Sequence, residues 1–233
     1  MTRRIGLIGA GDMGARMARR LLAAGHDVGV CERNQAVLAE FRAQGVRCST
    51  LAADVSDGDA VVVMVSTDAQ VLAVLGGAGG VIEGMTKEAP PVILIMSTCM
   101  PATVRAASEM LAPYGAAVID APVSGGLGGA ENGTLSIMLG GPDAAIDQVM
   151  DILTCLGRNL FRCGELGAGQ TTKLINNMIG LTNLFLVSEA LDMARHAGLR
   201  LDSLVAALDA SAGRTALSRN AAAARQQFAT WSR

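Results

Sequence analysis

Residues 4–14 read RIGLIGAGDMG, the most informative stretch of the 233-residue chain. An apolar run at 4–8 predicts a buried strand, and three glycines follow it in the spacing G-x-G-x-x-G. An amphipathic helix is predicted next, with its apolar residues on one side and its arginines on the other. A second strand at 27–31 then leads to an acidic residue, Glu32. This order of elements is typical of a dinucleotide-binding site.

The three glycines have separate physical roles in such a site. Gly9 permits the tight turn, Gly11 lets the backbone approach a pyrophosphate, and Gly14 lets the helix pack on the strand. The free N–H groups at the start of the helix then face the phosphates. The alternative is a glycine-rich turn of purely structural use. The matching elements on both sides of the motif favour the nucleotide site.

Strands and helices continue to alternate after this motif. Unbroken Val, Ile and Met runs are typical of a parallel sheet that is covered on both faces. Further strands are expected at 46–48, 60–65, 92–96, 116–119, 134–139 and 159–163. Ligands bind beyond the carboxyl ends of such strands, where the chain places Val65, Ser66, Ser97 and Thr98. Their polar groups either line the cofactor or belong to loops and helix caps.

A second glycine-rich segment, DAPVSGGLGGAENG at 120–133, follows the strand expected at 116–119. Ser124, Gly125 and Gly126 can present consecutive N–H groups and a hydroxyl, an arrangement that suits a carboxylate. The alternative is a flexible connector.

The stretch 167–198 contains no proline and predicts one helix of nearly thirty residues, roughly 40 Å long. Its apolar residues surround most of the circumference, so we expect burial on several sides. Polar residues interrupt the apolar run, which favours a buried helix over a membrane span. Lys173, one of two lysines in the chain, lies near its start, and Asn177 follows on the same face.

Lys173 is the best candidate for proton transfer. His26 is expected on a connection that faces away from the strand ends, and His196 at the far end of the long helix. Tyr114 has no lysine four residues later, and the sequence has no metal-ligand cluster. Partial burial lowers a lysine pKa towards neutrality, which suits a group that exchanges a proton. The alternative is a surface lysine whose ammonium reaches solvent.

Composition excludes several classes of protein. Hydrophobic residues make up 51% and charged residues 17%, which allows a large core and argues against disorder. The net charge of −2 and the 3% aromatic content give no basis for nucleic-acid binding or for an anionic membrane surface. Five cysteines without a CxxC pair, and a start without a signal segment, lead us to expect the cytoplasm.

Three motifs together resemble a known family. GLIGAGDMGARMARRLLAAGHDV, DAPVSGGLGGAENGTLSIMLGG and GAGQTTKLINNM follow one another as in the β-hydroxyacid dehydrogenases, which include 3-hydroxyisobutyrate dehydrogenase. The resemblance implies an α/β fold: a doubly wound Rossmann domain at 1–164, then a long interdomain helix and an all-α domain at 165–233. It implies an oxidoreductase acting on a small hydroxyacid or semialdehyde carboxylate.

The resemblance also implies roles for individual residues. Lys173 would be catalytic, and Asn177 would bind the substrate. Ser124, Gly125 and Gly126 would hold its carboxylate. The nicotinamide dinucleotide would contact Gly9, Ala10, Gly11, Asp12, Met13, Gly14, Val65, Ser66, Gln70 and Thr98.

The residues after the second strand address the choice between NAD and NADP. Glu32 can accept hydrogen bonds from a ribose 2′-OH and would repel a 2′-phosphate. Arg33 could stack on adenine or pair with that phosphate. We favour NAD.

The chain is shorter than the family pattern, so we expect a shortened α domain. Apolar surface of the long helix would then be uncovered, and we expect a homodimer or higher homo-oligomer to cover it. The alternative function is a truncated dinucleotide-binding protein with a structural or regulatory role. The residues do not identify which hydroxyacid or semialdehyde is the substrate.

Overall fold

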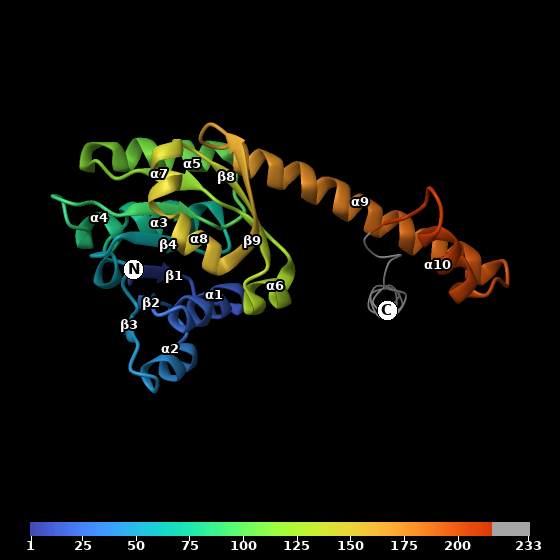
Figure 1. Cartoon of the computed structure of the whole chain (residues 1–233), viewed down its shortest axis with the longest axis horizontal. Helices are drawn as coiled ribbons and strands as arrows, with labels where there is room; N and C mark the ends of the chain where they lie inside the picture. The colour runs from blue at the N-terminus through green and yellow to red at the C-terminus, as the bar shows by residue number, and fades with distance from the viewer. Residues whose placement is uncertain (216–233) are drawn as a thin grey trace. The chain divides into compact units, whose positions relative to one another are not determined.

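The computed structural model describes residues 1–215 (Figure 1). The chain divides into two compact units, Met1–Leu174 and a second that begins at Ile175. Each unit is described separately below.

The first unit is built on one mixed sheet in the order β3-β2-β1-β4-β5-β6-β8-β7, with β9 also paired to β8. Pairs among β1 to β6 are parallel, whereas β8 is antiparallel to both β6 and β7. The strands are β1 (Arg4–Ile8), β2 (Asp27–Cys31), β3 (Arg47–Ser49), β4 (Ala60–Val63), β5 (Val92–Ile95), β6 (Val118–Asp120), β7 (Val123–Ser124), β8 (Leu135–Gly140) and β9 (Gly157–Gly164).

Helices cover both faces of this sheet (Figure 1). Alternate residues of one strand enter different cores: Leu94 belongs to one apolar cluster, and Ile93 and Ile95 belong to the other. This alternation is the period-two pattern of a strand buried on both sides. The helices are α1 (Asp12–Ala23), α2 (Gln35–Arg42), α3 (Asp68–Gly76), α4 (Val81–Gly84), α5 (Pro101–Leu111), α6 (Gly126–Asn132), α7 (Asp143–Gln148) and α8 (Met150–Leu156).

The sequence prediction was wrong about the sheet of this unit, which it expected to be parallel. The sheet is not wholly parallel, because β7 and β8 lie on either side of a short helix, α6, and pair antiparallel. That helix occupies part of the segment for which we expected a carboxylate nest or a connector. The helices α7 and α8 are separate, because the backbone leaves helical geometry at Val149 (φ −115°, ψ 13°).

The long helix is confirmed as α9 (Ala168–His196), 29 residues. In the second unit its residues Val187 and Leu191 pack with Val205 of α10 (Leu201–Asp209) in a small apolar cluster.

The expected burial of α9 on several sides is wrong. In its first turns Gln170 and Lys173 are buried, and further along a stripe that includes Leu184, Val187, Leu191 and Ala194 is buried. Apolar side chains elsewhere on the helix are 52–71% exposed: Ile175, Met178, Ile179, Leu181, Leu186 and Met193. By length and composition alone α9 could cross a membrane, and 11% of its apolar window is buried. A single such helix is weak evidence for a membrane span.

Candidate active site

The glycine-rich turn after β1 has the geometry that a dinucleotide requires. A Cβ at Gly14 would lie 1.9 Å from the carbonyl oxygen of Gly9, so only glycine lets α1 pack here. A Cβ at Gly11 would meet nothing within 4 Å. Gly11 is the N-cap of α1 and provides no side-chain cap, so the first N–H groups of α1 are available to phosphate oxygens.

A hollow of about 560 Å³ opens beside this turn, at the carboxyl ends of β1, β2 and β4. The register explains its position, because Ile8 is paired with both Cys31 and Val63 and the three strands end together. Seven predicted cofactor residues line it: Gly9, Gly11, Glu32, Arg33, Val65, Ser66 and Gln70. The other five predicted cofactor residues are not in its lining: Ala10, Asp12, Met13, Gly14 and Thr98.

Glu32 is held at the edge of the hollow by backbone N–H groups. Its Oε1 accepts hydrogen bonds from the N–H of Arg33 (2.7 Å) and of Asn34 (3.0 Å). Asn34 in turn caps α2 by accepting from the N–H of Ala36. The carboxylate therefore stands at a fixed place after β2, where the fold puts the adenosine ribose.

The turn after β4 is fixed by two polar side chains. Ser97 is buried, and its Oγ accepts a 2.8 Å hydrogen bond from the N–H of Val65. The Oε1 of Gln70 accepts from the N–H groups of Ser66 and Thr67, and Thr67 completes a capping box at the start of α3. Gln70 therefore shapes the rim of the hollow. Ser97 therefore stabilises a loop, which was the alternative to lining the cofactor.

Ser124 ends β7, where it is paired with Ser136 of β8. Gly125 (φ 132°) and Gly126 (φ 63°) then turn the chain into α6 in conformations that favour glycine. Gly126 has open space where a Cβ would stand. Their binding of a substrate carboxylate stays a prediction.

Lys173 lies early in α9, within the first unit, and is 8% exposed. Burial lowers the pKa of its ammonium from the ordinary 10.5. Among residues 1–215 no carboxylate lies within ion-pair distance of it. Such an amine loses its proton more readily than a solvated lysine. Asn177 belongs to the second unit, where it is half-buried.

The start of α9 is anchored to the sheet by a carboxylate that the sequence interpretation left unassigned. Asp120, at the end of β6, is fully buried and accepts 2.7 Å hydrogen bonds from the N–H groups of Gly167 and Gln170. Burial raises the pKa of this carboxyl group, and the backbone donors oppose that rise. The side chain of Gln170 is fully buried as well.

Comparison with known proteins decides the family. Residues 4–164 match the model described as the NAD binding domain of 6-phosphogluconate dehydrogenase. Residues 167–230 match the model described as NAD-binding of NADP-dependent 3-hydroxyisobutyrate dehydrogenase. The chain belongs to the β-hydroxyacid dehydrogenase family. Residues 4–164 of this family member form a nicotinamide dinucleotide-binding domain.

Individual relatives agree with the family. The probable mitochondrial 3-hydroxyisobutyrate dehydrogenase of Dictyostelium discoideum is 31% identical over 211 residues, 90% of this chain and 65% of that protein. The 2-(hydroxymethyl)glutarate dehydrogenase of Eubacterium barkeri is 32% identical over 91% of this chain and 70% of its own. The solved 3-hydroxyisobutyrate dehydrogenase of Mycobacterium tuberculosis with L-serine superposes with a TM-score of 0.83 at 28% identity, over 92% of this chain and 72% of that one.

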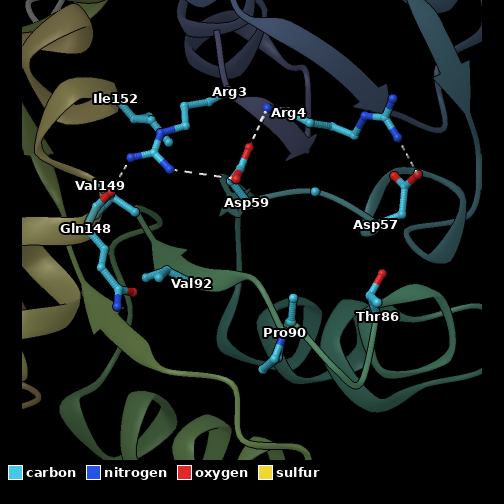
Figure 2. A pocket seen from close by; sticks show the side chains of 12 residues that line it. Arg3, Arg4, Asp57, Asp59, Thr86, Pro90, Val92, Gln148, Val149 and Ile152 are labelled. Atoms are coloured by element: carbon cyan, nitrogen blue, oxygen red, sulfur yellow. Dashed lines mark hydrogen bonds and ion pairs between the residues drawn. The ribbon is translucent and has the colours of Figure 1, made fainter. Parts of the chain in front are cut away.

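A second hollow, about 480 Å³, lies at the amino ends of β1, β4 and β5, and Figure 2 shows the side chains that line it. Its arginines already have acidic partners: Arg3 pairs with Asp59 and with Asp151, and Arg4 pairs with Asp57. His26 lies nearby, and its Nδ1 accepts a hydrogen bond from the N–H of Arg3. These contacts stabilise the fold, and we assign no chemistry to this hollow.

The sequence interpretation missed some of the residues that line the cofactor hollow. Thr50 and Leu51, after β3, line it together with Ala73 and Val74 of α3 and with Gly79. These residues are apolar or small and suit the face of an adenine ring. The sequence marks Thr50 and Leu51 only by their position after a strand end, and it gives no signal for Ala73, Val74 or Gly79, because the tertiary fold brings these segments together.

Proposed function

We propose that the protein is an NAD(P)-dependent oxidoreductase that acts on a small β-hydroxyacid or on the corresponding semialdehyde carboxylate, with Lys173 as the proton donor and acceptor. The observation that carries this proposal is the burial of Lys173 with no carboxylate partner among residues 1–215. The family supports the reaction class, and the chain spans 65% of the Dictyostelium relative.

The chemistry divides between the cofactor and this chain. When bound, the nicotinamide accepts a hydride from the alcohol carbon or returns it to the carbonyl carbon. In oxidation, neutral Lys173 removes the hydroxyl proton. In reduction, its ammonium donates a proton to the oxygen. The lowered pKa of Lys173 raises the fraction of neutral amine at a given pH, which favours oxidation.

The remaining residues would bind and orient the substrate. Ser124, Gly125 and Gly126 would hold the carboxylate through a hydroxyl and backbone N–H groups. Asn177 would hydrogen-bond the substrate hydroxyl or orient Lys173. The N–H groups that follow Gly11 would hold the pyrophosphate, for which the open space at Gly11 provides room.

A substrate panel tests this function directly. Turnover is followed at the NADH absorbance with 3-hydroxyisobutyrate, 3-hydroxypropionate, serine, glycerate and succinic semialdehyde, with each cofactor. We expect at least one β-hydroxyacid or semialdehyde to react. No reaction across the panel, together with tight NADH binding, would favour the structural or regulatory alternative.

We further propose that NAD is the preferred cofactor. The fixed carboxylate of Glu32 supports this preference, since it can accept from a 2′-OH and repels a 2′-phosphate. Five cysteines without disulfides support a reducing compartment, and we propose the cytoplasm.

We also propose that a second copy of the chain covers the exposed apolar side chains of α9. Met178, Leu186 and Met193 are 62–71% exposed on a helix with few charges, a surface that a soluble monomer rarely presents. Light scattering at micromolar concentration would give the mass of a dimer or a larger oligomer. A monodisperse monomer would contradict this proposal.

A further inference from the structure

The first turn of α9 is held by a carboxylate that comes from β6. Oδ1 of Asp120 accepts from the N–H of Gly167, and Oδ2 accepts from the N–H of Gln170. The first N–H groups of a helix have no partner within the helix, so a buried helix start needs an acceptor from elsewhere. The partial positive charge of the helix start also suits an acidic group. Asp120 meets both needs.

Gln170 makes a second attachment, to the end of β5. Its side-chain Oε1 accepts from the N–H of Cys99 (3.1 Å), and its Nε2 donates to the carbonyl oxygen of Ser97 (2.7 Å). The hydroxyl of the same Ser97 accepts from the N–H of Val65, which lines the cofactor hollow. A continuous series of hydrogen bonds thus joins the hollow to α9.

Close packing leaves the first turn of α9 little freedom. A Cβ at Gly169 would lie 2.3 Å from the carbonyl oxygen of Met138, and one at Gly140 would come nearly as close to Oδ1 of Asp120. The helix start is therefore seated directly on the backbone of β8. Lys173 follows Gln170 by three residues, about one helical turn later. The position of its side chain therefore depends on the packing of the first turn of α9 against β8.

We propose that Asp120 and Gln170 are positioning residues, which hold Lys173 in its partly dehydrated place by fixing the first turn of α9 to the ends of β6 and β5. This inference rests on the proposed function, in which Lys173 exchanges a proton with the substrate. Neither side chain needs to touch the substrate. If these hydrogen bonds are removed, the first turn of α9 becomes more mobile. Water then reaches the ammonium of Lys173, and proton transfer slows.

The chain offers a direct probe because it contains only two lysines, Lys173 and the exposed Lys87. Labelling with [ε-¹³C]lysine gives two titrating NMR signals in the cofactor-free protein, and Lys87→Arg assigns them. The test variants are Gln170→Met, which keeps the volume and removes both side-chain hydrogen bonds, and Asp120→Asn, which leaves one N–H without an acceptor. Thermal unfolding identifies the folded variants.

We expect the Lys173 titration to move upward by roughly 0.5–1 pH unit in each folded variant, while Lys87 serves as the unchanged internal reference. We expect kcat to fall at least about tenfold, with the KM for NAD within about threefold, because the dinucleotide contacts are intact. A folded variant with an unmoved Lys173 titration, or with a moved titration and unchanged kcat, would overturn the proposal.

Wild-type amide exchange covers the case in which neither variant folds. The N–H groups of Gly167 and Gln170 should then exchange as slowly as those of the central strands, and fast exchange would overturn the proposal. The NMR titration needs no turnover. If the protein turns over no substrate of the panel, the proposed function is refuted. The NMR titration still tests whether Asp120 and Gln170 position Lys173.

Discussion

Asp120 Oδ2 accepts a 2.7 Å hydrogen bond from the backbone N–H of Gln170, although the two residues are 50 positions apart in the chain. The contact joins the carboxyl end of a central strand to the first turn of α9. A carboxylate this deeply buried is costly unless donors surround it. The start of α9 supplies those donors, and in return it acquires a fixed position on the sheet.

The first prediction concerns the stability that this contact provides. Asp120→Ala leaves two buried N–H groups without an acceptor, so we expect the free energy of unfolding to fall by about 2–4 kcal/mol in urea titrations. Glu109→Ala removes an exposed carboxylate of α5 and is the matched control. A loss for Asp120→Ala that equals the loss for the control would refute the capping role.

Two glycines of the motif should separate stability from cofactor binding. Gly14→Ala should lower the melting temperature strongly, because its Cβ would overlap the carbonyl oxygen of Gly9. Gly11→Ala should leave the melting temperature nearly unchanged and weaken NADH binding at least about tenfold, because its methyl group would enter the space of the pyrophosphate. Differential scanning calorimetry and NADH fluorescence titration measure the two effects. Equal NADH affinity of Gly11→Ala and wild type would argue against this site.

The pH dependence of turnover should follow the protonation of Lys173. Oxidation needs the neutral amine, so its rate should rise with pH and level off above the Lys173 pKa, which burial places below 10.5. Reduction needs the ammonium, so its rate should fall as the pH rises through the same region. Profiles of kcat in both directions check this sign. Two profiles that rise together would contradict the role of Lys173.

Cofactor preference should follow the fixed carboxylate of Glu32. We expect kcat/KM with NAD to exceed the value with NADP, and Glu32→Gln to narrow the ratio at least about fivefold by removing the repulsion of a 2′-phosphate. Glu109→Gln removes an exposed carboxylate of α5 that is not among the residues lining the hollow, and is the control. A wild-type preference for NADP would show that Arg33 rather than Glu32 determines the choice.

Local patterns predicted the parts of the site that the chain encodes locally. The glycine spacing at Gly9, Gly11 and Gly14 and the run of β1 are contiguous in sequence, so the dinucleotide fold was predictable from them. Lys173 was selected by excluding the other titratable candidates; its burial is confirmed, and its catalytic role stays a prediction. The strand pairing was less predictable from the sequence, since the antiparallel pairing of β7 with β8 depends on the turn made by α6.

Long-range contacts were out of reach of the same reasoning. The hydrogen bonds of Gln170 reach Ser97 and Cys99, 73 and 71 positions away, and no periodicity in the sequence reports such a contact. The position of Asp120 was the one available signal. A carboxylate that directly follows a buried strand is expected to have hydrogen-bond donors nearby. The exposure of α9 was mispredicted because an apolar circumference does not specify what covers it.

The central claim is that Lys173 transfers the proton. The most direct test is kcat of Lys173→Ala on the best substrate of the panel, beside Lys87→Ala as the control, with NADH binding measured for both variants. We expect Lys173→Ala to lose about 10²–10⁴-fold in kcat with NADH affinity intact, and Lys87→Ala to match the wild type. Turnover of Lys173→Ala within tenfold of the wild type, with binding intact, would contradict the account.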